Sequence, residues 1–195
     1  MSGLLIAAPM RLEALLVRSA AAGARVYRTG MGPRRAREAA AELLREPGEA
    51  LLVLGFCGGL DEQSEPGEVV VAEEVRTAED EGHEPQSVPC TGARELAAAL
   101  AGRGLRVRTG TVVCVSRLAV GERRAQLAEG GAIAVDMESV WLAPGARGRP
   151  FGVVRVTLDS PSHELFRPQM PAAALRAAGA LRRAAGALHE WPPAD

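Results

Sequence analysis

The sequence predicts a single α/β domain in which a central, twisted, mixed β-sheet carries helices on both faces. Its 195 residues are enough for one domain with a sizeable core. Apolar residues make up 47% of the chain, which argues against disorder. Short apolar runs alternate with segments of helical period, the pattern of a sheet covered by helices. We expect the domain to span residues 1–189 and a flexible tail to occupy residues 190–195.

Apolar runs of strand length alternate with amphipathic segments in the first half of the chain. The expected strands span residues 4–8, 25–29, 50–54 and 69–72, and the expected helices span residues 11–22 and 33–45. Pro33 suits the first turn of its helix, because that position needs no backbone N–H donor. One side of the same helix is apolar and comprises Ala36, Ala40, Leu43 and Leu44. A Glu-Pro-Gly-Glu turn at residues 65–68 leads into the fourth strand.

The second half repeats the alternation without repeating the sequence. The expected strands span residues 107–115, 133–135 and 151–157, and the expected helices span residues 94–101, 122–128, 137–142 and 171–188. Pro144 stops the third of these helices. An apolar stripe marks the last helix and comprises Ala174, Ala178, Leu181, Ala185 and Leu188. The segment 77–91, rich in acidic residues and proline, is expected to be a mobile loop.

The composition excludes several classes of function. A net charge of −1 and an aromatic content of 3% give no basis for binding nucleic acid or an anionic membrane. The chain contains no lysine, so Schiff-base chemistry and a phosphate-loop lysine are both excluded. Its three cysteines lack C-x-x-C spacing, which favours a reducing cytosol over a disulfide framework or zinc site. We see no signal peptide or membrane-spanning run, and expect a cytoplasmic protein without stable membrane insertion.

Two carboxylates and an arginine follow apolar runs at the ends of expected strands. Residues 134–139 read Ala-Val-Asp-Met-Glu-Ser, and residues 153–159 read Val-Val-Arg-Val-Thr-Leu-Asp. Ligand sites of open α/β sheets form at such strand ends. Two carboxylates and an arginine at this place indicate a polar, proton-accepting ligand. Purely local roles are the alternative: Asp136 is a natural N-cap, Glu138 complements a helix dipole, and Asp159 precedes a turn.

A glycine-rich stretch, Gly-Phe-Cys-Gly-Gly-Leu at residues 55–60, follows the expected strand 50–54. Closely spaced glycines let a backbone approach a ligand, although a tight turn explains them equally well. The stretch is not G-x-G-x-x-G, so it is no dinucleotide fingerprint. A second motif, Gly-Glu-Val-Val-Val, follows at residues 67–71.

Together these motifs resemble those of the nucleoside phosphorylase and nucleosidase superfamily, most closely its hopanoid-associated phosphorylase branch. That superfamily carries a similar Val-Asp-Met-Glu-Ser signature, and a G-x-x-G-G-L stretch followed by a G-D/E-V-V-V strand. The resemblance covers Ile6 to Asp159 and implies a nucleoside phosphorylase-like fold acting on a small-molecule nucleoside. It implies no cofactor and no metal, with phosphate as a possible co-substrate. We expect a homodimer or a larger homo-oligomer.

The resemblance assigns roles to individual residues. Met137 would pack against the ribose, and Glu138 would accept hydrogen bonds from the ribose hydroxyls. Asp159 would protonate N7 of the departing purine, which is a poor leaving group as an anion. Independently of the resemblance, Arg155 lies four residues before Asp159 on the same face of the expected strand. We place it in the same substrate site and expect it to hold one of the carboxylates, since an unpaired buried charge is costly. The other expected substrate-binding residues are Phe56, Cys57 and Gly58.

Glu13 bears on the choice between hydrolysis and phosphorolysis. It lies three residues after a methionine, as does the glutamate that holds the attacking water in methylthioadenosine and S-adenosylhomocysteine nucleosidases. This match favours hydrolysis, although a solvated helix glutamate is the simpler reading. Gly30, Gly32 and Arg28 form the expected phosphate or nucleophile region and keep phosphorolysis open.

We therefore expect an enzyme that cleaves the N-glycosidic bond of a purine nucleoside. The expected substrate is a 5′-substituted adenosine such as adenosylhopane, from which adenine is released. The alternatives are a methylthioadenosine/S-adenosylhomocysteine nucleosidase and a nucleoside-binding or sensing module without turnover. Two positions depart from the family: Phe56 stands where relatives carry a small or hydroxylated residue, and Leu158 where many carry serine.

Overall fold

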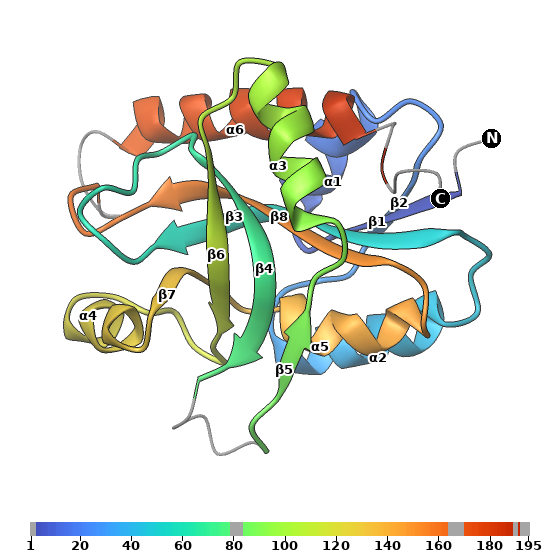
Figure 1. Ribbon diagram of the computed structural model, residues 1–195, viewed down its shortest axis with the longest axis horizontal. Helices are drawn as coiled ribbons and strands as arrows, with labels where there is room; N and C mark the ends of the chain where they lie inside the picture. Colours follow the sequence, from blue (N-terminus) through green and yellow to red (C-terminus); the bar gives the residue numbers. More distant parts are fainter. Residues whose placement is uncertain (1–2, 79–83, 164–169, 189–190, 192–195) are drawn as a thin grey trace.

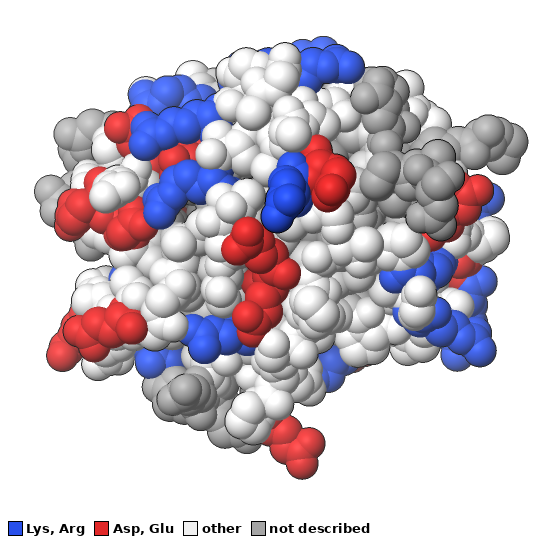
Figure 2. Space-filling model, viewed as in Figure 1, with Lys and Arg blue, Asp and Glu red and all other residues white. Residues whose placement is uncertain are grey.

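A computed structural model describes residues 3–78, 84–163, 170–188 and Trp191 (Figure 1). Within these residues, eight strands form one mixed sheet with helices on both of its faces, so the predicted fold class is confirmed. Their helices include none that is both long and apolar enough to cross a membrane. On the face seen in Figure 2, acidic and basic side chains are interspersed.

The sheet closes partly on itself. Its strands are β1 (Leu4–Ala8), β2 (Arg25–Arg28), β3 (Ala50–Gly59), β4 (Val69–Thr77), β5 (Ser87–Pro89), β6 (Val107–Cys114), β7 (Ala132–Asp136) and β8 (Phe151–Asp159). Their order is β2-β1-β3-β7-β6-β4-β5, and β8 pairs with both β3 and β4. Strands β3, β7, β6, β4 and β8 therefore form a closed ring. Within that ring β3 runs parallel to β8 but antiparallel to β7, which makes the sheet mixed.

Helices lie on both faces of the sheet. They are α1 (Arg11–Arg18), α2 (Pro33–Leu43), α3 (Ala93–Gly102), α4 (Glu122–Glu129), α5 (Ser139–Leu142) with the 3₁₀ turn η1 (Ala143–Ala146), and α6 (Met170–Ala187). Helices α1, α3 and α6 cover one face of the sheet, and α2 and α5 cover the other (Figure 1). Side chains of β1 alternate accordingly: Ile6 packs into the first layer and Leu5 into the second. Both faces are thus buried, which explains the continuous apolar run of β1.

Several segments differ from the sequence prediction. The glycine-rich stretch is not a tight turn, because β3 continues extended to Gly59 and pairs there with β7 and β8. The predicted loop 77–91 contains β5, which extends the sheet by pairing with β4, while residues 79–83 lie outside the described residues. The predicted helix 137–142 begins only at Ser139. Trp191 of the predicted tail is buried, and residues 190 and 192–195 lie outside the described part.

Candidate active site

A cavity of about 130 Å³ lies where β1, β3, β7 and β8 end. Ligand sites of α/β sheets form at such strand ends. Most of the residues predicted for the site line this cavity: Glu13, Phe56, Cys57, Gly58, Met137, Glu138 and Asp159. The rest of its lining is largely apolar and comprises Pro9, Met10, Met31, Leu118, Val135 and Leu158, with Asp136.

Glu13 is a buried carboxylate held by two backbone amides. Although it lies on the first turn of α1, its side chain is only 2% exposed, so it is not a solvated helix glutamate. Its Oε2 accepts a hydrogen bond from the Met10 N–H at 2.5 Å, and its Oε1 accepts one from the Phe56 N–H at 2.6 Å. Gly55 makes room for it, since an added Cβ there would lie 2.6 Å from Oε1.

Arg155 is fully buried and holds two carboxylates that come from one short segment. Its Nη2 lies 2.6 Å from Asp136 Oδ2 and 3.3 Å from Glu138 Oε2, and it donates to Ser139 Oγ at 3.0 Å. Glu138 also accepts a hydrogen bond from the Gly32 N–H at 3.0 Å. Arg155 therefore lies behind Glu138 rather than in the cavity lining, where it orients the carboxylate that faces the cavity.

Asp136 was predicted only as a helix cap, but it also binds Cys114 and Arg155. Its Oδ1 accepts hydrogen bonds from the Glu138 and Ser139 amides, and Cys114 Sγ donates to the same oxygen at 2.9 Å. Burial alone would raise its pKa, but the Arg155 charge and these hydrogen bonds outweigh burial and lower the pKa. Asp136 is therefore the fixed counterion of Arg155.

Two other carboxylates that line the cavity, Glu138 and Glu13, have raised pKa values instead. Burial raises the pKa of Glu138 to about 7, although the Arg155 charge opposes the shift. Burial likewise raises the pKa of Glu13, against the Arg155 charge and the amides of Phe56 and Met10. Carboxyls with raised pKa values can exchange a proton near neutral pH, as general acids and bases require.

Asp159 is bound by a residue that the sequence analysis missed. It is 4% exposed and forms an ion pair with Nη2 of Arg124, which is itself only 3% exposed. Arg155, four residues earlier on the same strand, pairs instead with Asp136 and Glu138. The pairing of β8 with β3 shifts by one residue after Thr157, so that Asp159 rather than Leu158 lies opposite Gly58. Such a bulge turns the following side chains relative to the preceding ones.

The remaining predicted residues lie partly in the cavity wall and partly outside it. Phe56, Cys57 and Met137 line the cavity. Burial raises the pKa of the Cys57 thiol to about 12, so this cysteine is a small apolar residue rather than a nucleophile. Arg28 and Gly30 instead line a separate hollow of about 370 Å³ beside α2. Gly32 joins the site only through its amide on Glu138.

No local pattern in the sequence identified Arg124. It lies on an expected helix directly after Arg123, and nothing in the helical pattern distinguishes the two arginines. The same holds for Met31 and Leu118, which lie on loops and reach the cavity through tertiary folding. Among the described residues, no cluster of three His, Cys, Asp or Glu side chains is placed to hold a metal ion.

Comparison with known proteins agrees with this fold. The chain matches the family model of the Phosphorylase superfamily over residues 16–185. Comparison with curated proteins gives no significant match. Among solved structures, the fold is similar to that of the 5′-methylthioadenosine/S-adenosylhomocysteine nucleosidase of Neisseria meningitidis in complex with methylthio-immucillin-A. The TM-score is 0.78 at 18% sequence identity, and the alignment covers 96% of this chain and 98% of that chain.

Two further solved structures share the fold over almost their whole length. The S-adenosylhomocysteine nucleosidase of Streptococcus pyogenes has a TM-score of 0.73 at 18% identity, with 94% of this chain and 95% of that chain covered. The futalosine hydrolase of Helicobacter pylori strain 26695 has a TM-score of 0.76 at 17% identity, with 93% and 96% covered. Because the family model spans most of the sequence, the chain belongs to the phosphorylase superfamily, as its motifs predicted.

Proposed function

We propose that this protein cleaves the N-glycosidic bond of a purine nucleoside by hydrolysis and releases adenine. The observation that carries the proposal is the convergence of three buried carboxylates, Glu13, Glu138 and Asp159, on one cavity from different parts of the chain. Each has its own set of partners, which suits three separate tasks. The nucleosidases that share the fold provide independent support.

Glu138 suits the ribose. A carboxylate can accept hydrogen bonds from two neighbouring hydroxyls at once, and Arg155 and the Gly32 amide fix its orientation. Met137 lies beside it on the cavity wall, where an apolar side chain can pack against the sugar ring. Asp159 suits the base, since proton transfer to N7 turns the purine into a neutral leaving group.

Glu13 supports hydrolysis over phosphorolysis. It lines the cavity, where a carboxylate repels phosphate and accepts a proton from an attacking water. The alternative, phosphate as co-substrate, would use Gly30, Gly32 and Arg28. Arg28 and Gly30 line a different hollow, and the Gly32 amide is engaged by Glu138, so the cavity lining favours water as the nucleophile.

The apolar wall around the cavity supports a 5′-substituted adenosine as substrate. Met31 and Leu118 line the cavity and are each 54% exposed, so they can extend an apolar surface beyond the sugar. This agrees with adenosylhopane, and also with methylthioadenosine, whose 5′ group is small and apolar. S-adenosylhomocysteine, whose 5′ tail is charged, is the other substrate of the alternative. The free cysteines and the exposed apolar side chains agree with a cytosolic homo-oligomer, whose stoichiometry light scattering would measure.

Release of free adenine tests the function. Purified protein is incubated with adenosine, methylthioadenosine, S-adenosylhomocysteine and a long-chain 5′-alkyl adenosine, and the base is measured by chromatography. We expect adenine from the apolar 5′-substituted compounds in preference to adenosine. Tight nucleoside binding without any adenine would instead support the sensing module.

A further inference from the structure

Arg124 is a buried arginine beside the candidate active site, and the sequence analysis assigned it no role. Its Nε donates to the Ala119 carbonyl at 3.0 Å and its Nη1 to the Gly59 carbonyl at 3.4 Å, while Nη2 meets Asp159 Oδ2. The guanidinium is thus fixed by the loop that precedes α4, through Ala119, and by the end of β3, through Gly59. Gly59 directly follows the residue at which β3 pairs with Asp159 of β8. A side chain held at three nitrogens can set the position of the carboxylate that it binds.

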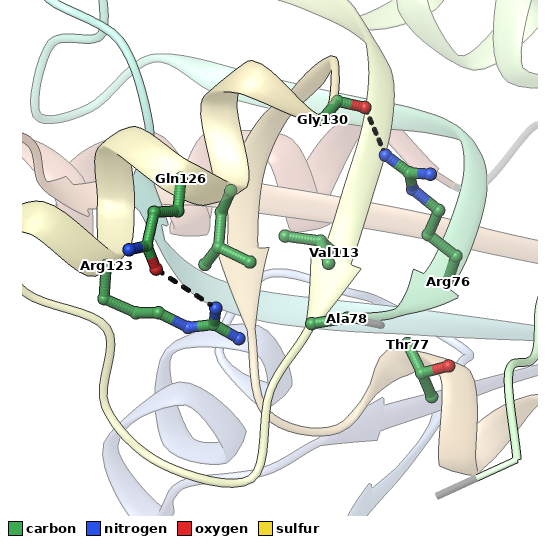
Figure 3. A pocket seen from close by; sticks show the side chains of 8 residues that line it. Arg76, Thr77, Ala78, Val113, Arg123, Gln126 and Gly130 are labelled. Atoms are coloured by element: carbon green, nitrogen blue, oxygen red, sulfur yellow. Dashed lines mark hydrogen bonds between the residues drawn. The ribbon is translucent and has the colours of Figure 1, made fainter. Parts of the chain in front are cut away.

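Helix α4, which carries Arg124, also lines a second cavity. This hollow has a volume of about 260 Å³, and Arg123, Gln126 and Leu127 contribute to its lining (Figure 3). There Arg123 Nη1 lies 3.5 Å from Gln126 Oε1, as the dashed line in Figure 3 shows. Consecutive arginines of one helix therefore have different surroundings: Arg123 lines this hollow, and Arg124 binds Asp159 of the candidate active site.

Gly58 shows how closely the ion pair borders the cavity. An added Cβ at Gly58 would lie 3.3 Å from Arg124 Nη2 and 3.5 Å from Asp159 Oδ1. Gly58 and Asp159 both line the cavity, whereas Arg124 lies behind them. The arginine thus engages one carboxyl oxygen from behind, and the other oxygen lies beside a glycine of the cavity wall.

We propose that Arg124 is a positioning residue that aims Asp159 at the purine and stabilises the carboxylate left after proton transfer; this rests on the proposed function. In that step the O–H bond of the Asp159 carboxyl breaks and a bond from its proton to purine N7 forms. The bond between C1′ and N9 breaks, and its electron pair leaves with the neutral base. Water bonds to C1′ and gives a proton to Glu13, from which solvent returns it to Asp159.

The charges around Asp159 give this role a measurable signature. Among the described residues, the other ionisable side chains that line this part of the cavity or adjoin it are Cys57 on β3, Glu13 on α1, Asp136 at the end of β7 and Glu138 after it, with Arg155 on β8 and His163 after it. Arg155 is engaged by Asp136 and Glu138. Replacing Arg124 by glutamine removes a positive charge that pairs directly with Asp159, so the Asp159 carboxyl should keep its proton to higher pH. A neighbouring arginine shifts such a titration by about one to three pH units.

The experiment compares the full-length protein with the variants Arg124→Gln, Arg124→Lys and Arg123→Gln. Two quantities are measured in each: the pH profile of kcat/KM for adenine release, and the carbon-13 NMR titration of the Asp159 carboxyl, assigned with Asp159→Asn. In R124Q we expect kcat/KM to fall at least about tenfold at low pH. Both the alkaline limb and the titration should move up by about one to three pH units. R124K keeps the charge and should restore the titration but not the full rate, and R123Q should match the unmodified protein.

An unshifted titration and limb in R124Q would overturn the proposal, as would the same shift in R123Q. If the unmodified protein releases no base from any nucleoside, the proposed function fails. The carbon-13 titration, which needs no turnover, then still decides whether Arg124 controls Asp159.

Discussion

Replacing Glu138 by glutamine should remove a specific part of the protein's pH dependence. The carboxyl has an ordinary pKa of 4.5, which burial raises to about 7 in the folded protein against the Arg155 charge. The folded state therefore holds this proton more tightly than the unfolded chain. The resulting stability is complete below pH 4.5 and is lost as the pH rises through about 7. Between pH 5 and pH 8 the linkage relation gives a loss of about 2 to 3 kcal/mol in the free energy of unfolding.

Urea denaturation at pH 5 and pH 8 measures this loss directly. Over this interval we expect the free energy of unfolding of Glu138→Gln to fall by about 2 to 3 kcal/mol less than that of the unmodified protein, whatever the variant's stability at pH 5. Glu38→Gln is the matched control, because Glu38 lies on the surface of α2 and pairs with Arg34 at 2.9 Å. It should retain the pH dependence of the unmodified protein. An equal loss in E138Q and in the unmodified protein would refute the claim that Glu138 is a proton-binding group poised near neutral pH.

Three further variants test Asp159, Glu13 and the buried Arg155. Asp159→Asn should lower kcat by about 10² to 10⁴ while a nucleoside analogue still binds, measured by turnover and calorimetry; near-normal turnover would remove Asp159 from the mechanism. Glu13→Gln should abolish hydrolysis with little change in nucleoside affinity, and a variant as active as the unmodified protein would exclude Glu13 as the group that activates water. Arg155→Met should lower the free energy of unfolding by about 3 to 5 kcal/mol at pH 7, because two buried carboxylates lose their cation. A loss below about 1 kcal/mol in urea denaturation would show that the carboxylates do not depend on it.

Motifs within single segments were enough to predict most of the cavity. The runs that end at Asp136 and Asp159 are apolar and rich in β-branched residues, so their strand character and the position of their carboxylates follow from local pattern. Glu13 needed the resemblance, because its burial depends on amides of Met10 and Phe56 that only the folded chain brings together. The reach of β3 to Gly59 was missed, since glycines favour turns until neighbouring strands pair with them.

Arg124 could not be found from the sequence for a different reason. Its partner Asp159 is 35 residues away, and the pairing depends on the register shift that turns Asp159 from the Arg155 side. A bulge of one residue leaves no reliable trace in an apolar strand, so the sequence suggested Arg155 as the nearest cation. Which arginine meets which carboxylate is thus a property of the assembled sheet.

The measurement that tests the account most directly follows the nucleophile into the product. Purified protein is incubated with methylthioadenosine or a 5′-alkyl adenosine in ¹⁸O-water, with and without phosphate, and the products are identified by mass spectrometry. We predict free adenine together with a sugar that carries one ¹⁸O atom at C1′, at the same rate in both buffers. A strict requirement for phosphate with ribosyl 1-phosphate as product, or no adenine from any nucleoside, would contradict the account.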